Sequence, residues 1–196
     1  MNLALFDFDG TITTKDTLID FILYSFGKVK FIIGITLSFP HLVLFKMKII
    51  ANWNAKERFM KFFFKGADVD SIHESGKVYA KNVIPDIIRP EAQKQIDFHK
   101  KNGDKIFIVT ASPDIWIKPW AEQHGITVIA TRLAVIDNKL TSKIAGKNCH
   151  GQEKVNRIKE VINIEDYDKI YAYGDSSGDT QMLAIADVKY FRWKKL

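Results

Sequence analysis

The stretch Leu3-Ala4-Leu5-Phe6-Asp7-Phe8-Asp9-Gly10-Thr11 is where the fold can first be predicted, because an apolar run ends there in two acids. Four consecutive apolar residues predict a short buried strand over residues 3–6. Residues two apart on a strand face the same side, so we expect Asp7 and Asp9 to point together beyond the strand's carboxyl end. Open α/β sheets bind their ligands at that edge. Two carboxylates there can hold a hard cation, and one of them can be a nucleophile.

Two later stretches repeat this pattern of an apolar strand that ends in polar residues. Lys105-Ile106-Phe107-Ile108-Val109 is followed by Thr110-Ala111-Ser112, and Lys169-Ile170-Tyr171-Ala172-Tyr173 by Gly174-Asp175-Ser176-Ser177-Gly178-Asp179. A lone Asp-x-Asp also fits an ordinary solvated strand end, but three polar strand ends favour one shared site. Strands alternate with predicted helices along the chain, which indicates a parallel sheet covered on both faces.

In this order, the stretches resemble the haloacid dehalogenase (HAD) superfamily of aspartate-nucleophile phosphatases. The closest resemblance is to its phosphoserine-phosphatase-like branch (subfamily IB), which has a helical C1-type cap. The matching positions are Asp7, Asp9, Thr11, Thr110, Lys154, Asp175 and Asp179. The resemblance implies an α/β fold: a Rossmann-like parallel sheet with helices on both faces, plus a small α-helical cap. It also implies a core domain of residues 1–14 and 84–196, a cap of residues 15–83, and a central Asp7 strand.

The resemblance also implies roles for these residues in hydrolysis of a phosphate monoester with Mg²⁺. Asp7 would attack phosphorus and become an aspartyl phosphate, while Asp9 would act as general acid and then as base. The metal ligands would be the Asp7 carboxylate, the Asp9 backbone carbonyl and Asp175, with Asp179 acting directly or through water. The groups expected around the phosphate are Thr110, the backbone N–H groups of Gly10 and Ala111, the Thr11 hydroxyl and the Lys154 ammonium.

Two positions depart from the phosphoserine-phosphatase pattern. That pattern has a lysine directly before a glycine, where this chain has His150 before Gly151. Related members use a Gly-x-x-Lys arrangement, which points to Lys154, and Lys147 is the alternative. The pattern often has Asn before its last Asp, where this chain has Gly178. We therefore expect water to replace one side-chain oxygen near the metal.

Two further residues bear on the substrate. Asp16 either caps the helix predicted over residues 17–26 or, by the resemblance, contacts a substrate amine. Arg58 lies on a helix predicted over residues 55–64, on the same face as Lys61, and could bind a substrate carboxylate or phosphate. Solvated surface is the alternative for both basic residues.

The segment from Phe21 to Lys56 contains no Asp or Glu but several lysines among apolar residues. Its apolar part, residues 31–45, is shorter than the ~20 residues that a membrane span needs. We interpret it as the core of the cap with lysines at a solvated rim. The alternative is a cationic, apolar surface that meets anionic lipid or an acyl chain.

Composition limits the remaining function classes. The 196 residues are 46% hydrophobic and 27% charged, which is typical of one globular core with an insertion. The net charge of +6 suits an enzyme that handles anionic esters, and no nucleic-acid motif accompanies it. Cys149 is the only cysteine, expected to be small and buried. Strand residues begin almost at once, so we expect no signal peptide and a cytoplasmic protein of undetermined oligomeric state.

The sequence thus predicts a Mg²⁺-dependent phosphatase that acts on phosphoserine or another small phosphorylated metabolite. A lipid phosphate such as phosphatidylglycerophosphate is the alternative substrate, suggested by the acid-free apolar segment. A non-catalytic HAD-like binding module with a basic, apolar cap is the alternative class. The presence of Asp7 and Asp9 argues against such a module, and the cap insertion argues against a signalling receiver domain.

Overall fold

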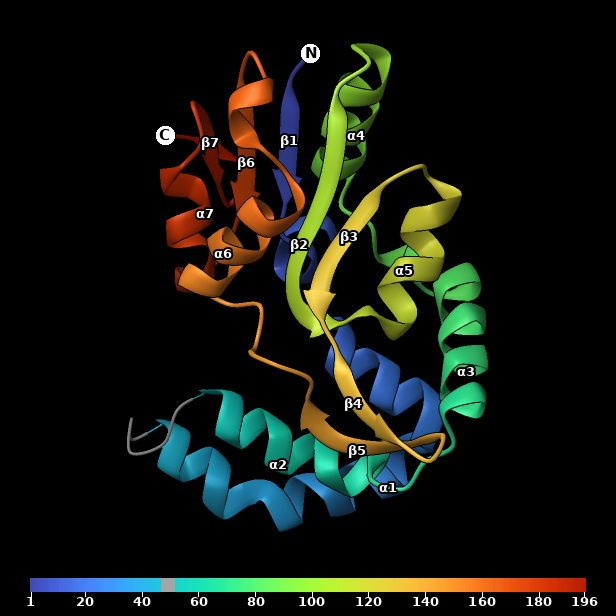
Figure 1. Cartoon of the computed structure of the whole chain (residues 1–196). Helices are drawn as coiled ribbons and strands as arrows, with labels where there is room; N and C mark the ends of the chain where they lie inside the picture. Colours follow the sequence, from blue (N-terminus) through green and yellow to red (C-terminus); the bar gives the residue numbers. More distant parts are fainter. Residues whose placement is uncertain (47–51) are drawn as a thin grey trace.

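The computed structural model describes residues 1–46 and 52–196, without the side chains of residues 41–46, 52–55 and 142. Its main sheet has the strand order β3-β2-β1-β6-β7-β8, with β1 (Leu3–Phe6) near the centre (Figure 1). The neighbours β2 (Lys105–Pro113) and β6 (Ile170–Gly174) run parallel to it. The predicted fold class and the central Asp7 strand are therefore confirmed.

The outer strands complete this sheet. Strand β3 (Thr127–Thr131) pairs in parallel with β2, and β7 (Val188–Phe191) pairs in parallel with β6. The short β8 (Lys194–Lys195) is antiparallel to β7. The carboxyl ends of β1, β2 and β6 therefore meet at one edge, as the three polar strand ends predicted.

Each face of the sheet packs on its own helices. Alternate residues of β1 belong to two separate cores: Ala4 and Phe6 to one, and Leu3 and Leu5 to the other. The first core includes side chains of α4 (Pro90–Lys101) and α5 (Asp114–Gln123), and the second those of α6 (Gln152–Val161) and α7 (Thr180–Ala184). A strand buried on both faces reads as a continuous apolar run, which is why β1 was predictable.

A helical insertion separates β1 from β2. It comprises α1 (Thr17–Lys46), α2 (Asn52–Phe64) and α3 (Val69–Asn82), and the short 3₁₀ turn η2 (Ile84–Ile87) leads back to the sheet. The helix predicted to end at Gly27 does break there, since Gly27 has φ of +77°, but the chain then continues as helix through Pro40 to Lys46. No helix in the described ranges is both long and apolar enough to cross a bilayer.

The hairpin of β4 (Leu133–Ile136) and β5 (Lys139–Ile144) lies beside α2 at the end of the molecule away from the main sheet (Figure 1). The Leu140 N–H donates to the Ala67 carbonyl (2.9 Å), and its carbonyl accepts from the Gly66 N–H (2.8 Å). The predicted division into a core and a cap at residues 15–83 stays a prediction. The hairpin, counted there with the core, is hydrogen-bonded to the insertion.

Candidate active site

A cavity of about 650 Å³ lies between the carboxyl edge of the sheet and the helical insertion. Its floor is polar and comes from the ends of β1, β2 and β6 and from the start of α6. Its opposite wall includes apolar side chains of α1 and α2, namely Leu18, Ile19, Ile35 and Phe59. The cavity therefore joins a charged end to an apolar end.

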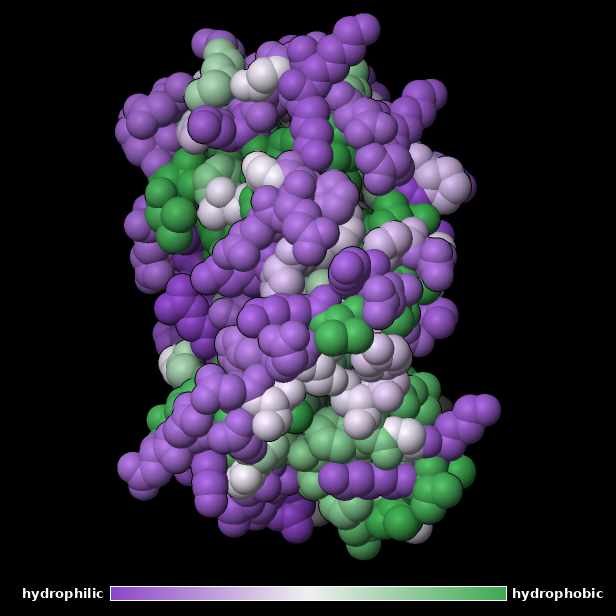
Figure 2. Space-filling model, turned by 90° about the vertical axis from the view of Figure 1, so that its right-hand side faces the viewer, coloured by the Kyte–Doolittle hydropathy of each residue, from purple (hydrophilic) through white to green (hydrophobic). Residues whose placement is uncertain are grey.

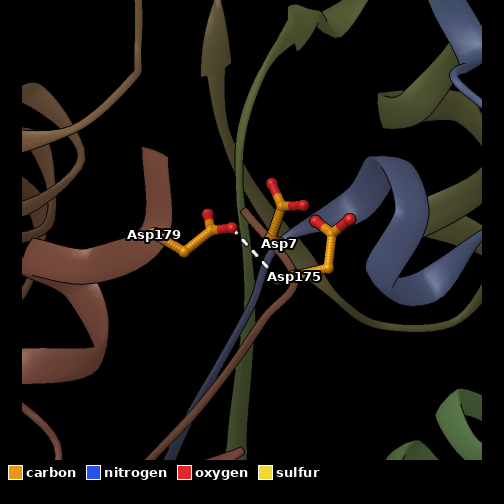
Figure 3. A group of neighbouring side chains, drawn as sticks. All are labelled: Asp7, Asp175 and Asp179. Atoms are coloured by element: carbon orange, nitrogen blue, oxygen red, sulfur yellow. Dashed lines mark hydrogen bonds between the residues drawn. The ribbon is translucent and has the colours of Figure 1, made fainter. Parts of the chain in front are cut away.

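Three carboxylates form the floor's acidic cluster (Figure 3). One oxygen each of Asp7, Asp175 and Asp179 lie within 4.8 Å of one another. Gly10 is tightly fitted beside them, because a Cβ there would lie 2.4 Å from Asp175 Oδ2 and its φ is +77°. A compact set of carboxylate oxygens, with Asp175 only partly buried, fits a small hard cation such as Mg²⁺ that keeps part of its water shell.

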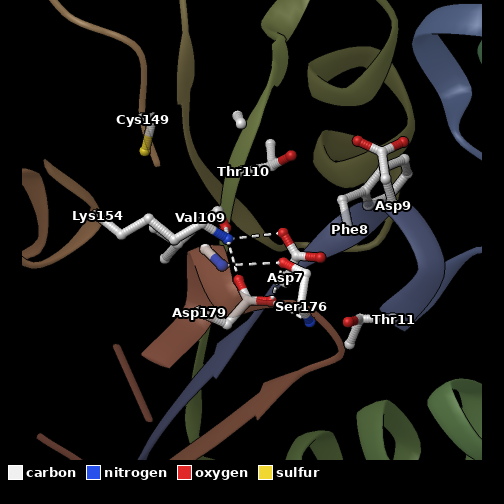
Figure 4. Close-up of polar contacts among 12 residues, drawn as sticks. Asp7, Phe8, Asp9, Thr11, Val109, Thr110, Cys149, Lys154, Ser176 and Asp179 are labelled. Carbon is white, nitrogen blue, oxygen red and sulfur yellow. Dashed lines mark hydrogen bonds and ion pairs between the residues drawn. The ribbon is translucent and has the colours of Figure 1, made fainter. Parts of the chain in front are cut away.

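Lys154 is buried against this cluster (Figure 4). Its Nζ donates to Asp7 Oδ1 (2.7 Å), Asp179 Oδ1 (2.6 Å) and the Val109 carbonyl (2.7 Å), so all three ammonium protons are used. Lys147, the alternative, is exposed and does not line the cavity. The structure therefore brings Lys154, and not Lys147, to Asp7.

The electrostatics of this trio follow from burial and pairing. Burial raises the pKa of Asp7 to about 7, with Asp179 and Asp9 adding to the rise and Lys154 opposing it. Burial also acts to raise the pKa of Asp179, but Lys154 and hydrogen bonds from Ser176 hold it below its usual range. Burial alone would lower the pKa of Lys154, yet the two carboxylates raise it above its usual range. The two carboxylates therefore favour the charged form of Lys154, and burial favours the neutral form of Asp7.

Asp9 reaches the cavity by a different route from the one predicted. Strand β1 ends at Phe6 and residues 8–12 form a tight helical turn, so Asp7 and Asp9 do not share a strand face. Asp9 Oδ1 instead accepts from the Thr17 N–H (2.7 Å) and hydroxyl (2.5 Å), and Oδ2 accepts from the Ser112 hydroxyl (2.5 Å). These bonds hold Asp9 between the first turn of α1 and the end of β2.

The expected phosphate-binding groups divide into two sets. Gly10, Thr110 and Ala111 line the cavity with Asp7 and Lys154. Thr11 does not line it. Thr11 is buried within the turn over residues 8–12, and its hydroxyl points to Asp175 Oδ1 at 3.4 Å. The prediction that Thr11 binds substrate is therefore not supported, and Thr11 lies behind the acidic cluster.

The two residues expected to bear on the substrate also differ. Asp16 caps α1, accepting from the Ile19 N–H (3.1 Å), and it lines the cavity as well, so both of its predicted roles remain compatible with its position. Arg58 is exposed and is not among the lining residues. Residues two apart on a helix point in different directions, and it is Lys56 that lines the cavity and donates to the Ala111 carbonyl (2.8 Å).

Sequence reasoning missed a chain of polar groups behind Asp9. The Trp116 indole N–H donates to the Thr17 hydroxyl (2.9 Å), which in turn donates to Asp9. Ser112, the last hydroxyl of the Thr110-Ala111-Ser112 run, had been noticed in the sequence but given no role. Its position two residues after Thr110 was a usable indication, whereas nothing local to Thr17 or Trp116 pointed to Asp9.

The two departures from the phosphoserine-phosphatase pattern are neighbours in space. The His150 ring lines the cavity directly over Gly178, where a Cβ would lie 2.5 Å from His150 Nε2. The adjacent Cys149 is buried as predicted, and burial raises the pKa of its thiol to about 11. Burial and the raised pKa both disfavour the thiolate, and Cys149 is not among the residues that line the cavity.

The chain is similar to known proteins in sequence and in fold. The sequence profile of the haloacid dehalogenase-like hydrolases matches residues 4–184. Protein CicA of Caulobacter vibrioides is 36% identical over 199 residues, which cover 97% of this chain and 85% of that protein. A solved structure of a protein with unknown function from Bordetella pertussis Tohama I has a TM-score of 0.79 at 20% identity, covering 97% of this chain and 89% of that one.

A substrate-bound phosphoserine phosphatase is also a structural neighbour, with a TM-score of 0.61 at 23% identity and coverage of 97% of this chain and 85% of that one. At such identities the two solved structures establish the shared fold. The matched residues, 4–184, include the acidic cluster, Lys154 and the whole insertion. The chain belongs to the haloacid dehalogenase-like hydrolase family.

Proposed function

We propose that this chain is a Mg²⁺-dependent phosphatase that hydrolyses a phosphate monoester through an aspartyl phosphate on Asp7. The observation that carries the proposal is the buried Lys154 ammonium, which bridges Asp7 and Asp179 on the cavity floor at 2.7 and 2.6 Å. A cation fixed beside a carboxylate can offset the charge of an incoming phosphate. The phosphoserine phosphatase among the structural neighbours adds support.

Two steps complete the reaction. In the first, an Asp7 oxygen attacks phosphorus, the P–O bond to the alcohol breaks, and the departing oxygen takes the proton of Asp9. In the second, Asp9 takes a proton from water, the water oxygen attacks phosphorus, and the bond from phosphorus to Asp7 breaks. The hydroxyls of Thr17 and Ser112 hold the Asp9 carboxylate in place for both transfers.

The chain offers three metal ligands. Asp7 and Asp175 would bind the ion through carboxylate oxygens, and the Asp9 carbonyl would complete the protein's share. Asp179 is better suited to act through water, because Oδ1 accepts from Lys154 and Oδ2 accepts from the N–H groups of Asp175 and Ser176. When bound, Mg²⁺ supplies positive charge that neutralises phosphate oxygens and favours the ionised form of Asp7.

The substrate could be phosphoserine or another small phosphorylated metabolite. Asp16 at the cavity could pair with an amine, and Lys56 is a candidate partner for a second anionic group. A lipid phosphate is a second candidate, and a specific observation favours it: the cavity wall formed by Leu18, Ile19, Ile35 and Phe59 is apolar. Such a wall suits an acyl or other apolar substituent better than the charged groups of an amino acid.

The test is release of inorganic phosphate by the purified chain with Mg²⁺. The substrate panel contains phosphoserine, sugar phosphates, nucleotides and phosphatidylglycerophosphate in mixed micelles. Asp7→Asn should abolish turnover, and Asp137→Asn, in the turn of the β4–β5 hairpin, is the matched control that should not. Turnover that persists in Asp7→Asn would contradict the mechanism. A folded chain that is inactive on every ester would favour the non-catalytic binding module. The predicted cytoplasmic location is also part of the proposal.

A further inference from the structure

The second half of α1 exposes a row of large apolar side chains. After the break at Gly27, five of them have between 47% and 75% of their surface exposed. We call them the α1 outer face, which consists of Val29, Ile32, Ile33, Leu37 and Phe39. Figure 2 shows hydrophobic side chains gathered at the lower end of the molecule, the end at which Figure 1 places α1 and α2. Surface of this kind needs an explanation when it is contiguous.

Helix geometry arranges these residues as one stripe. At about 100° per residue, the α1 outer face spans an arc of roughly 160° centred near Val29. Lys28 falls just outside one edge of this arc and Lys30 just outside the other. The exposed Thr36 also falls within the arc, and its hydroxyl donates to the Ile32 carbonyl (2.9 Å). Apart from this hydrogen-bonded hydroxyl, the solvent side of the helix is apolar, and lysines border it on both sides.

The opposite side of the same helix is already packed. Gly34 and Ser38 are buried, and a Cβ on Gly34 would lie 2.3 Å from the Phe63 ring of α2. Ile35, on this inner side, forms part of the cavity wall. Folding of the insertion thus uses the inner side of α1, and the described residues leave the α1 outer face to solvent.

The charge around the α1 outer face has one sign. No Asp or Glu occurs between Asp20 and Glu57 in the sequence. Lys28 and Lys30 are exposed, and neither forms an ion pair within the part of the chain that the structure describes. An exposed apolar stripe that lysines of its own helix border on both sides is complementary to a bilayer with anionic headgroups.

We propose that the α1 outer face docks on the surface of an anionic lipid bilayer. The apolar side chains would enter the boundary between headgroups and acyl chains, and Lys28 and Lys30 would lie among the headgroup phosphates. A second copy of the chain fits less well, because a two-fold contact would bring the same lysines face to face without acids to pair with. The proposal concerns binding and does not require the proposed catalytic activity.

The experiment measures sedimentation of the full chain with vesicles. Equal parts of phosphatidylcholine and phosphatidylglycerol form the anionic vesicles, and phosphatidylcholine alone forms the neutral ones. We expect binding to the anionic vesicles that weakens with salt, and much weaker binding to the neutral ones. The Asp7→Asn variant should bind as the wild type does, so failure of the catalytic proposal would leave this result intact.

Three double variants separate the contributions to binding. The double variant Ile32→Gln with Leu37→Gln should lower the partition coefficient onto vesicles by about tenfold or more. Glutamine preserves the helix, but it removes the favourable free energy of moving two apolar side chains from water into the bilayer. Lys28→Gln with Lys30→Gln should lower it about 25-fold on anionic vesicles only. The control is Ile136→Gln with Val161→Gln, which removes apolar side chains of similar exposure (64% and 60%) elsewhere on the surface. The control should bind as the wild type does.

Three results would overturn the proposal. One is a folded wild-type chain that does not sediment with anionic vesicles. Another is equal binding by the wild type and by Ile32→Gln with Leu37→Gln. The third is a concentration-dependent dimer, seen by light scattering, together with no binding to vesicles. If the same pair of substitutions dissociates this dimer, the α1 outer face binds a second copy of the chain.

Discussion

Replacing Lys154 by methionine tests the claim that its ammonium holds the acidic site together. Methionine preserves an unbranched apolar stem but removes the charge and three hydrogen bonds. The change leaves Asp7 and Asp179, whose side chains are 10% and 1% exposed, facing one another without their cation. We therefore expect a loss of folding stability as well as of activity.

The size of the loss follows from the burial of the pair. Removing one partner of a buried ion pair costs about 3–5 kcal/mol, because a buried charge is left uncompensated. Asp7 can relieve part of this by taking a proton, since its pKa of about 7 is already raised by burial. We therefore expect a value near the lower limit, about 3 kcal/mol, which for a chain of this length lowers Tm by roughly 6–12 °C.

The assay is thermal and urea unfolding in EDTA, so that no divalent ion replaces the ammonium. Asp7→Asn is the informative comparison, because it removes a like charge from Asp179 while Lys154 keeps one partner. We expect that variant to lie within about 1 kcal/mol of the wild type. Adding Asp179→Asn to Lys154→Met should restore at least about 1 kcal/mol, because the two sites are coupled.

The activity of Lys154→Met should fall by about 10²–10³-fold in phosphate release, the loss typical of one preorganised electrostatic group. A variant as stable as the wild type in EDTA would refute the reasoning, since the three short contacts would then contribute nothing. A variant that is destabilised but fully active would confine Lys154 to a structural role.

Three other expectations can be checked with simple measurements. Asp9→Asn should keep the Tm of the wild type but lower turnover by about 10²–10⁴-fold in steady-state assays. Ser112→Ala removes one of three hydrogen bonds to Asp9 and should lower turnover less. A larger loss in Ser112→Ala than in Asp9→Asn would contradict the roles assigned to these two residues. Mg²⁺ at about 100 times its Kd should raise the free energy of unfolding by about 2.7 kcal/mol, as measured by thermal unfolding. Asp175→Asn should abolish most of this stabilisation, and an unchanged stabilisation would place the metal elsewhere. Cys149, which is buried and has a pKa of about 11, should react with a thiol reagent at pH 8 only after urea unfolding, and rapid reaction of the native chain would show that the site is open.

The parts of the fold that sequence predicted are those with local causes. Strand β1 is buried on both faces and therefore reads as an uninterrupted apolar run. The start of α6 at Gln152 also has a local cause, because Gly151 precedes it with φ of +61°. The meeting of polar groups at one sheet edge followed from parallel strand direction alone.

The errors concern contacts between segments that are distant in sequence. The orientation of Asp9 depends on Thr17 and on Ser112, which is 103 residues later. Whether Arg58 or Lys56 faces the cavity depends on the rotation of α2 about its axis, which spacing along one helix leaves undetermined. A candidate list of residue types can thus be drawn from sequence, whereas the direction of each side chain requires the packed structure.

The two departures from the phosphoserine-phosphatase pattern illustrate the same dependence, because the two residues are neighbours in the structure. Sequence treated the histidine at 150 and the glycine at 178 as separate losses of a lysine and an amide. In space the His150 ring occupies the volume that a side chain at Gly178 would fill. The Lys154 ammonium comes from the first turn of α6 and reaches Asp7. Because this lysine comes from the first turn of the helix, His150 is left free to line the cavity while a cation still lies beside the Asp7 carboxylate.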